Sequence, residues 1–358
     1  MTWDIIKILL PITLTFFIGI LITPTITNFL YKHKMWKKKS GKITTDGQVA
    51  TIFNQLHKDK EVGTPRMGGV VIWGSVIISI GLILILSKFL PETIFEKLDF
   101  LSRNQTWIPV ATLILGALFG LVDDWLEIKG SHDQKAGGLS FKKRLLVVGL
   151  IGVAVSSWFY FKLGVNAISI PFSNTDLILG AFIIPFFTLV MMVIYSGGVI
   201  DGLDGLSGGV FAIIYSAYGI IAFSLGQINL AAFCAAIVGA TLAFLWFNIP
   251  PARFYMSETG SMALTITLAV VAFMTDSIVG GIGIAVLPII ALPLIISIAS
   301  TVIQLASKKL RNGKKVFLVA PLHHHFEALG WPAYKVTMRY WIFTMIVAFI
   351  GIIVTLIS

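Results

Sequence analysis

Long stretches without charged side chains limit the possible folds of this chain more than any other feature. Nine stretches contain no Asp, Glu, Lys or Arg: Leu9–Leu30, Met67–Ser87, Asn104–Val122, Leu145–Phe161, Leu177–Ile200, Gly205–Ala252, Thr259–Thr275, Ser277–Ser307 and Tyr340–Ser358. Most are close to the ~20 residues that cross a bilayer as a helix. Only 12% of the 358 residues are charged, whereas about a quarter are charged in a soluble domain. The sequence therefore predicts an integral membrane protein.

Two of these stretches are too long for one straight span. Gly205–Ala252 contains the turn-forming residues 226–229 (Gly-Gln-Ile-Asn), so we expect it to divide into two helices. Ser277–Ser307 contains two prolines, and we expect one tilted or broken helix there, because neighbouring helices can satisfy the freed backbone groups. The sequence thus predicts an all-α integral membrane fold with ten transmembrane helices, in which residues 1–358 form a single polytopic domain.

The loops between these helices share the polar side chains unevenly. Ten spans put both termini on one side, and the five loops on the other side hold 22 of the 27 Lys and Arg, 11 of the 17 Asp and Glu and all six His. These loops are residues 31–66, 123–144, 201–204, 248–262 and 308–339. Because Lys and Arg concentrate in cytoplasmic loops, we expect these loops to be cytoplasmic and both termini external. Their net charge of +11 (22 minus 11) would attract phosphorylated solutes and the lipid bilayer; we expect no nucleic-acid partner.

Carboxylates gather where the third span reaches this polar face. Asp123 and Asp124 end the span, and Glu127 follows one turn later. The C-terminus of a helix carries partial negative charge and disfavours carboxylates, so this cluster indicates a function or a compensating cation. The alternative is an interface anchor in which these side chains pair with Lys129 or Lys142.

Two further clusters lie on the same face. Asp201 and Asp204 belong to the repeat Asp-Gly-Leu-Asp-Gly before the sixth span, where helix capping and tight turns are an alternative explanation. Asn248, Tyr255 and Glu258 lie between the seventh and eighth spans. Tyr255 could stack on a base or belong to an interfacial aromatic belt, and Glu258 could bind a ligand or cap a helix.

The fourth cluster is the run His323, His324 and His325. Three consecutive histidines do not share one helix face, and neither a nearby cysteine nor a His-Glu-x-x-His pattern accompanies them, so a zinc site is not indicated. They could donate hydrogen bonds to a pyrophosphate; a solvated loop is the alternative. Carboxylate oxygens favour Mg²⁺ over zinc, and Mg²⁺ beside a cationic surface is typical of phosphoryl transfer.

Taken together, these motifs resemble a known family of membrane enzymes. The Asp123-Asp124 pair, the Asp201–Gly205 repeat and residues 247–253 with 259–261 resemble the polyprenyl-phosphate sugar-1-phosphate transferases. The resemblance covers nearly the whole chain and implies ten helices with the site on the cytoplasmic side of the bacterial inner membrane.

A narrower resemblance rests on residues 321–327 (Pro-Leu-His-His-His-Phe-Glu), 330–332, 63–65 and 67–69. These are similar to the branch of the family that transfers phospho-N-acetylmuramoyl-pentapeptide. That branch implies that undecaprenyl phosphate attacks UDP-N-acetylmuramoyl-pentapeptide in peptidoglycan synthesis. The products are lipid I and UMP, and Mg²⁺ is required. A homodimer is possible on the general frequency of two-fold assemblies.

The resemblance also implies roles for the acidic residues. Asp201 and Glu258 would hold Mg²⁺ on the donor pyrophosphate, while Asp123 or Asp124 would orient or deprotonate the acceptor phosphate. A phosphate monoester has a second pKa of about 6, so the acceptor is mostly dianionic at neutral pH. We therefore expect charge neutralisation and in-line positioning to dominate catalysis; a two-step route through an aspartyl-phosphate stays open.

The remaining candidates are expected to bind substrate. Asp204, Asn248 and Tyr255 would recognise uridine. Lys60 and the three histidines would bind phosphate groups. The apolar fifth span and Ser277–Ser307 are expected to form a lipid-facing groove for the polyprenyl tail.

Several positions depart from the family pattern. Glu127 stands where the family has Lys, and Arg66 stands where it has Thr in Thr-Pro-Thr-Met. Residues 198–200 (Gly-Val-Ile) replace Asn-Leu-Thr, and residues 257–258 (Ser-Glu) replace Gly-Asp. Arg144 replaces a usual Lys and is expected to bind substrate. Since Lys to Glu reverses a charge, Arg66, Lys129 or Arg144 is expected to supply the missing cation.

Three other interpretations compete with this one. A sister transferase that uses UDP-N-acetylglucosamine would share the aspartates, but the three histidines argue against it. A transporter would carry its charges at mid-membrane depth, whereas the spans here are almost free of charge. A catalytically impaired relative would also explain the departures.

Overall fold

The computed structural model describes residues 2–38, 62–90, 93–101, 106–130, 138–173 and 175–358. The α-helices of this part are α1 Thr2–Lys32, α3 Val70–Phe89, α4 Ile94–Leu98, α5 Trp107–Lys129, α6 Phe141–Leu163, α7 Ile183–Ser196, α8 Leu206–Ser224, α9 Ile228–Asn248, α10 Ser257–Met274, α11 Gly283–Ile290, α12 Leu292–Leu310, α13 Leu322–Ala328 and α14 Ala333–Ile357. Short 3-10 helices are η1 Gly180–Phe182, η2 Gly197–Ile200 and η3 Ser277–Val279.

The membrane-crossing helices agree with the predicted pattern. Within the described ranges, nine helical segments are long and apolar enough to span a bilayer, and α11 with α12 makes ten if that pair forms one span. The two helices of the pair are bent by 65°, which is the broken helix predicted at Ser277–Ser307. The turn between α8 and α9 also lies where residues 226–229 predicted it.

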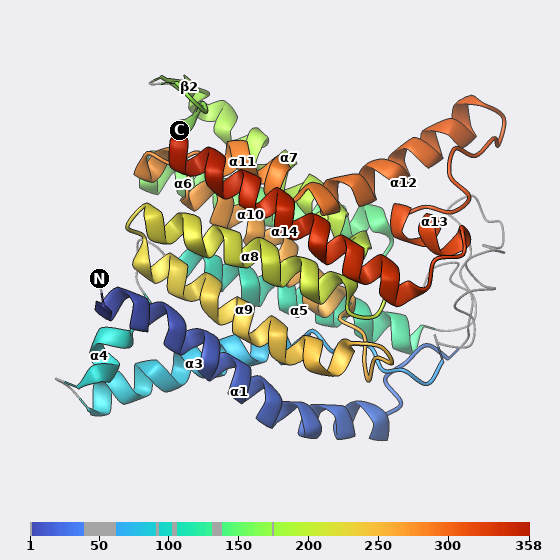
Figure 1. The fold of residues 1–358 in the computed structure, drawn as a ribbon, viewed down its shortest axis with the longest axis horizontal. Helices are drawn as coiled ribbons and strands as arrows, with labels where there is room; N and C mark the ends of the chain where they lie inside the picture. The colour runs from blue at the N-terminus through green and yellow to red at the C-terminus, as the bar shows by residue number, and fades with distance from the viewer. Residues whose placement is uncertain (1, 39–61, 91–92, 102–105, 131–137, 174) are drawn as a thin grey trace.

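Helix α10 lies in the centre of the bundle (Figure 1), and every one of its side chains except Glu258 is buried. Its contact with α5 depends on two glycines. A Cβ on Gly116 would lie 2.8 Å from the Cα of Ala263, and one on Gly120 would lie 2.2 Å from the carbonyl oxygen of Glu258. Lipid tails are as apolar as leucine, so close packing of small residues, rather than hydrophobicity, holds helices together in a membrane.

One feature outside the helices was not predicted. A small antiparallel hairpin precedes η1, with β1 Ala167–Ser169 paired to β2 Asp176–Ile178. The buried Asp276 supports it, because its carboxylate accepts hydrogen bonds from the backbone N–H groups of Ser169 (2.9 Å) and Ile284 (2.8 Å). Its strands are too short for the alternating pattern that marks a strand in a sequence.

The two chain ends lie at the same end of the bundle, on the left in Figure 1. The C-terminal ends of α1, α9 and α12 lie at the opposite end, on the right. This arrangement agrees with the even number of spans expected from the sequence, and it brings the polar loops together.

Candidate active site

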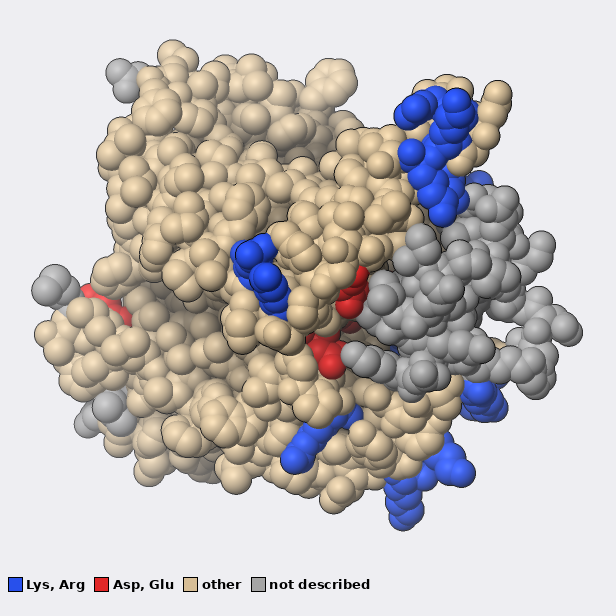
Figure 2. All heavy atoms as spheres, turned by 45° about the vertical axis from the view of Figure 1, so that its right-hand side comes forward, with Lys and Arg blue, Asp and Glu red and all other residues tan. Residues whose placement is uncertain are grey.

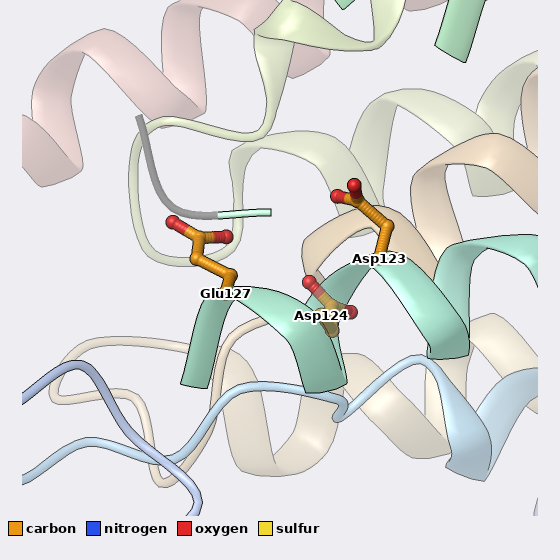
Figure 3. Close-up of side chains that lie close together, drawn as sticks. All are labelled: Asp123, Asp124 and Glu127. Atoms are coloured by element: carbon orange, nitrogen blue, oxygen red, sulfur yellow. The ribbon is translucent and has the colours of Figure 1, made fainter. Parts of the chain in front are cut away.

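The carboxylates of α5 form the centre of the candidate site. Asp123 and Asp124 are fully buried and Glu127 is nearly so. One oxygen from each lies within 4.8 Å of the others, on the last turns of the helix (Figure 3). Asp123 and Glu127 are four residues apart and therefore share a helix face.

Asp124 reaches across to the start of α10. The backbone N–H and the hydroxyl of Thr259 donate hydrogen bonds to Asp124 Oδ2 at 2.9 and 2.6 Å, and the N–H of Glu258 lies 3.3 Å from Oδ1. The first N–H groups of a helix lack partners within it and favour negative charge. The unfavourable position of Asp124 at the C-terminal end of α5 is therefore offset by the N-terminus of α10.

Arg144, in the first turn of α6, joins two carboxylates. Its guanidinium lies 3.1 Å from Asp123 and also donates to Glu258. Arg144 Nε donates to the carbonyl of Leu139 (3.0 Å), whose N–H donates to Asp123 (2.6 Å). Tyr195 of α7 donates its hydroxyl to Glu258 at 3.3 Å. The cation that the sequence assigned to substrate binding thus holds α5, α6 and α10 together.

Arg66 supplies the second cation. Its guanidinium lies 2.8 Å from Glu127 and 3.6 Å from Asp124. Lys37 also contacts Glu127, at 3.1 Å. Burial alone would lower the pKa of Arg66, but the carboxylates of Glu127 and Asp124 outweigh this effect and raise it. Lys129 lies over the ring of Trp125 instead, 4.0 Å from its centre. Among the described residues, Arg66 and Lys37 are therefore the cations beside Glu127.

Asp201 meets α10 from the turn before α8. It accepts a hydrogen bond from the hydroxyl of Ser207 (2.6 Å) and another from the N–H of Ser257 (2.9 Å). Ser257 has φ 57°, a left-handed conformation that favours glycine. This is the position at which the sequence departs from the family glycine.

The three histidines separate into two groups on α13. His323 and His324 are buried and face the Asp201 turn, since a Cβ on Gly202 would lie 2.5 Å and 2.7 Å from their Nε2 atoms. His324 Nδ1 pairs with Glu327 at 2.7 Å. His325 is turned away, and its Nδ1 accepts the N–H of Leu318 at 3.2 Å. The structure therefore places two of the three histidines beside the Asp201 turn.

The candidate uridine-binding residues form hydrogen bonds with the backbone of neighbouring loops. Asn248 is buried, accepts the N–H of Gly205 (2.9 Å) and donates to the carbonyl of Phe254 (2.8 Å). Asp204 accepts the N–H of Ala252 at 3.2 Å. The backbone of Tyr255 bonds to the loop before α3, through the carbonyl of Pro65 and the N–H of Gly68, both at 2.8 Å. Their role toward a nucleotide stays a prediction. Lys60 lies outside the described residues.

The chemistry of the acidic cluster suits a hard divalent cation. Asp123, Asp124 and Glu127 offer only oxygen ligands, and among the described atoms Asp123 Oδ2 is buried without a hydrogen bond, next to Arg144. The sequence placed the metal on Asp201 and Glu258, which remains a prediction. Sequence reasoning missed Lys37, Tyr195 and Thr259, because Lys37 belongs to a lysine-rich loop and the other two belong to apolar spans.

Similarity to known proteins assigns this fold and site to a class of polytopic membrane enzymes that transfer sugar phosphates. Residues 106–276, which include most of the cluster, match the family described as glycosyl transferase family 4. Three phospho-N-acetylmuramoyl-pentapeptide-transferases align over most of the chain. The protein of Listeria innocua is 34% identical over 83% of this chain and 86% of its own length. That of Clostridium perfringens is 32% identical over 96% and 98%, and that of Chloroflexus aggregans is 31% identical over 99% and 91%. The chain belongs to the phospho-N-acetylmuramoyl-pentapeptide transferase family.

Proposed function

We propose that this chain transfers phospho-N-acetylmuramoyl-pentapeptide from UDP to undecaprenyl phosphate, which yields lipid I and UMP, at the bacterial inner membrane. The observation that carries the proposal is its similarity to enzymes of that name over nearly the whole length of both chains. The meeting of five carboxylates and two arginines around the start of α10 supports it, because charge neutralisation and positioning are the main requirements of phosphoryl transfer.

The protein's own groups would position the two phosphorylated substrates. His323 and His324 can donate hydrogen bonds to phosphate oxygens from one side of the Asp201 turn. Asp123 and Asp124 are held rigidly by Arg144 and Thr259, and such fixed carboxylates would orient the acceptor with little loss of entropy.

Magnesium belongs to this proposal as the ion that neutralises the donor pyrophosphate. Asp123, Asp124 and Glu127 would hold it, or the predicted pair Asp201 and Glu258. Arg66 and Arg144 lie beside the same carboxylates and would add positive charge for the phosphate groups of the substrates.

The polyprenyl chain would lie along α7 and α12. Gly197 allows α12 to approach η2 closely, since a Cβ there would lie 2.8 Å from that of Leu294. Photo-crosslinking with a photoreactive prenyl phosphate would test this path: labelling of α7 and α12 supports it, and labelling confined to other helices contradicts it.

The orientation of the chain is testable because Cys234, its single cysteine, is fully buried. We expect Leu310→Cys to be labelled from the cytoplasm and Phe172→Cys from the outside. Both positions are exposed, and the wild-type chain is the control. Reversed labelling would place the site outside the cell.

The decisive experiment measures UMP release by the purified chain with UDP-N-acetylmuramoyl-pentapeptide and undecaprenyl phosphate, in magnesium or in EDTA. We expect release that needs the lipid and is lost in EDTA. Release with UDP-N-acetylglucosamine alone would assign the chain to the sister branch. No release with either donor, from protein that unfolds cooperatively on heating, would identify an impaired relative.

A further inference from the structure

The second half of the broken span forms an arm. After the 65° bend, α12 runs away from the bundle toward the upper right of Figure 1. Its inward stripe is polar, with Ser300, Gln304 and Ser307 buried. Its outward face is apolar and exposed. This is the reverse of a helix on a soluble protein, so the outer face requires an apolar surrounding.

The polar stripe fixes the chain that returns from the tip. Gln304 Oε1 accepts the N–H groups of Val316 and Phe317 (3.0 Å each), and its Nε2 donates to the carbonyl of Phe317 (2.8 Å). The hydroxyl of Ser307 donates to the carbonyl of Lys314 (2.8 Å). Helix and returning segment therefore form one rigid unit.

The tip of this arm is strongly basic. Lys309, Arg311, Lys314 and Lys315 are all exposed there, and Figure 2 shows the Lys and Arg atoms gathered at its end. The sequence has no Asp or Glu in residues 277–326. The positive charge of the tip is thus not balanced by acidic neighbours on the arm itself.

Large apolar side chains lie among these cations. Leu310 is 81% exposed, Val316 49% and Leu318 44%. Apolar side chains beside Lys and Arg match the boundary between acyl chains and headgroups. A soluble phosphorylated ligand would use the charges but leave these side chains in water.

We propose that the α12 arm, residues 292–318, binds acidic phospholipids in the leaflet that borders the site, with its apolar face in the acyl region and its cations on the headgroup phosphates. The occupant is the bilayer itself, and the charge complementarity selects its anionic lipids. The inference goes beyond the proposed reaction and does not depend on the identity of the donor.

The test uses a fluorophore at the tip. Leu310→Cys can be labelled selectively because Cys234 is buried, and the labelled chain is placed in nanodiscs. Quenching by brominated phosphatidylglycerol is then compared with quenching by brominated phosphatidylcholine at equal mole fraction. We expect about twofold or more stronger quenching by the anionic lipid, because each basic residue adds to the attraction. The matched control is a label at Phe182→Cys, which is 76% exposed, precedes α7 and has no basic cluster beside it in the sequence.

A second variant carries K309Q, R311Q, K314Q and K315Q together with the labelled cysteine. We expect it to quench equally with both lipids and to retain UMP release, since none of the four residues belongs to the site. Equal quenching of the unaltered arm by both lipids would overturn the proposal, as would a preference that survives neutralisation. Loss of the preference on addition of excess UDP would assign the tip to a soluble phosphate ligand instead.

Discussion

The start of α10 and the arm of α12 lie near the same end of the molecule, but their charged groups differ in exposure: they are largely buried and paired at α10 and exposed on the arm. At α10 the backbones almost touch, since a Cβ on Gly69 would lie 2.2 Å from the backbone nitrogen of Gly260. The carboxylates of Asp123 and Asp124 there are buried and held by Arg144 or by a backbone N–H group. At the arm, apolar side chains and cations are exposed together.

The difference suggests that one region holds catalytic groups in fixed positions, whereas the other contacts the membrane. Where charges are buried, each depends on a partner at a fixed distance, because an unpaired buried charge is costly. Where they reach the headgroups, mobile lipids supply the partners. Substitutions at α10 should therefore damage the protein more than substitutions on the arm.

Loss of the Asp124 charge should have the largest effect. Asp124→Asn keeps an acceptor for Thr259 but leaves Arg66 without one of its carboxylates. Removing one partner of a buried pair costs about 3 kcal/mol or more, which corresponds to about 100-fold in rate if it is lost from the transition state. UMP release measures this, with the exposed Asp176→Asn as control. Retention of more than half of the activity would show that the charge is not needed.

The contact between Gly69, before α3, and Gly260 of α10 leaves no room for an added methyl group. Gly69→Ala would push α3 away from Gly260 and should destabilise the protein by about 1–3 kcal/mol. Gly81→Ala, within α3, meets no atom within 4 Å and should be neutral or stabilising by up to about 1 kcal/mol. Thermal unfolding in detergent compares the two, and equal midpoints would contradict the packing argument.

Substitutions of Arg66 and Glu127 should have coupled rather than additive effects, because the two side chains are in contact. Glu127→Lys alone places a cation beside Arg66 and Lys37, and Arg66→Thr alone leaves Glu127 and Asp124 with less compensation. Each single change should lower UMP release by about tenfold. The double variant R66T/E127K should recover part of the loss, since contacting residues couple by about 0.5–3 kcal/mol. Strictly additive losses would show that the two residues act independently.

Relief of the left-handed conformation at Ser257 should stabilise the protein. Ser257→Gly removes a cost of about 1–2 kcal/mol and keeps the backbone N–H that bonds to Asp201. Ser261→Gly, in the body of α10, should destabilise by about 0.5 kcal/mol. Shifts of the thermal midpoint in the same direction for both variants would contradict this reasoning.

The smallest effect on activity is expected on the arm. Gln304→Ala removes the contacts to residues 316–317, so amide exchange of that segment should accelerate while UMP release stays unchanged. Thr301→Val, whose hydroxyl donates to the carbonyl of Ser297 within α12, is the matched control. A large loss of activity in Gln304→Ala would mean that the arm is coupled to the site.

The sequence by itself determined the spans and the end at which the chemistry gathers. Charge-free stretches placed the helices, two prolines predicted the broken helix at Ser277–Ser307, and the motifs around Asp123, Asp201, Glu258 and His323 fell on one face. These features follow from hydropathy, because only helices of about 20 apolar residues can cross a bilayer with their backbone groups satisfied.

Only the tertiary structure decided which groups meet. In the structure His325 points away from its two neighbours, and Asn248 forms hydrogen bonds with backbone loops. Arg66 pairs with Glu127, and Arg144 pairs with Asp123. The physical reason is that lipid and protein interior are almost equally apolar. Hydropathy therefore fixes that a helix crosses the membrane but not its neighbours, and the pairing of charges at helix ends depends on those neighbours.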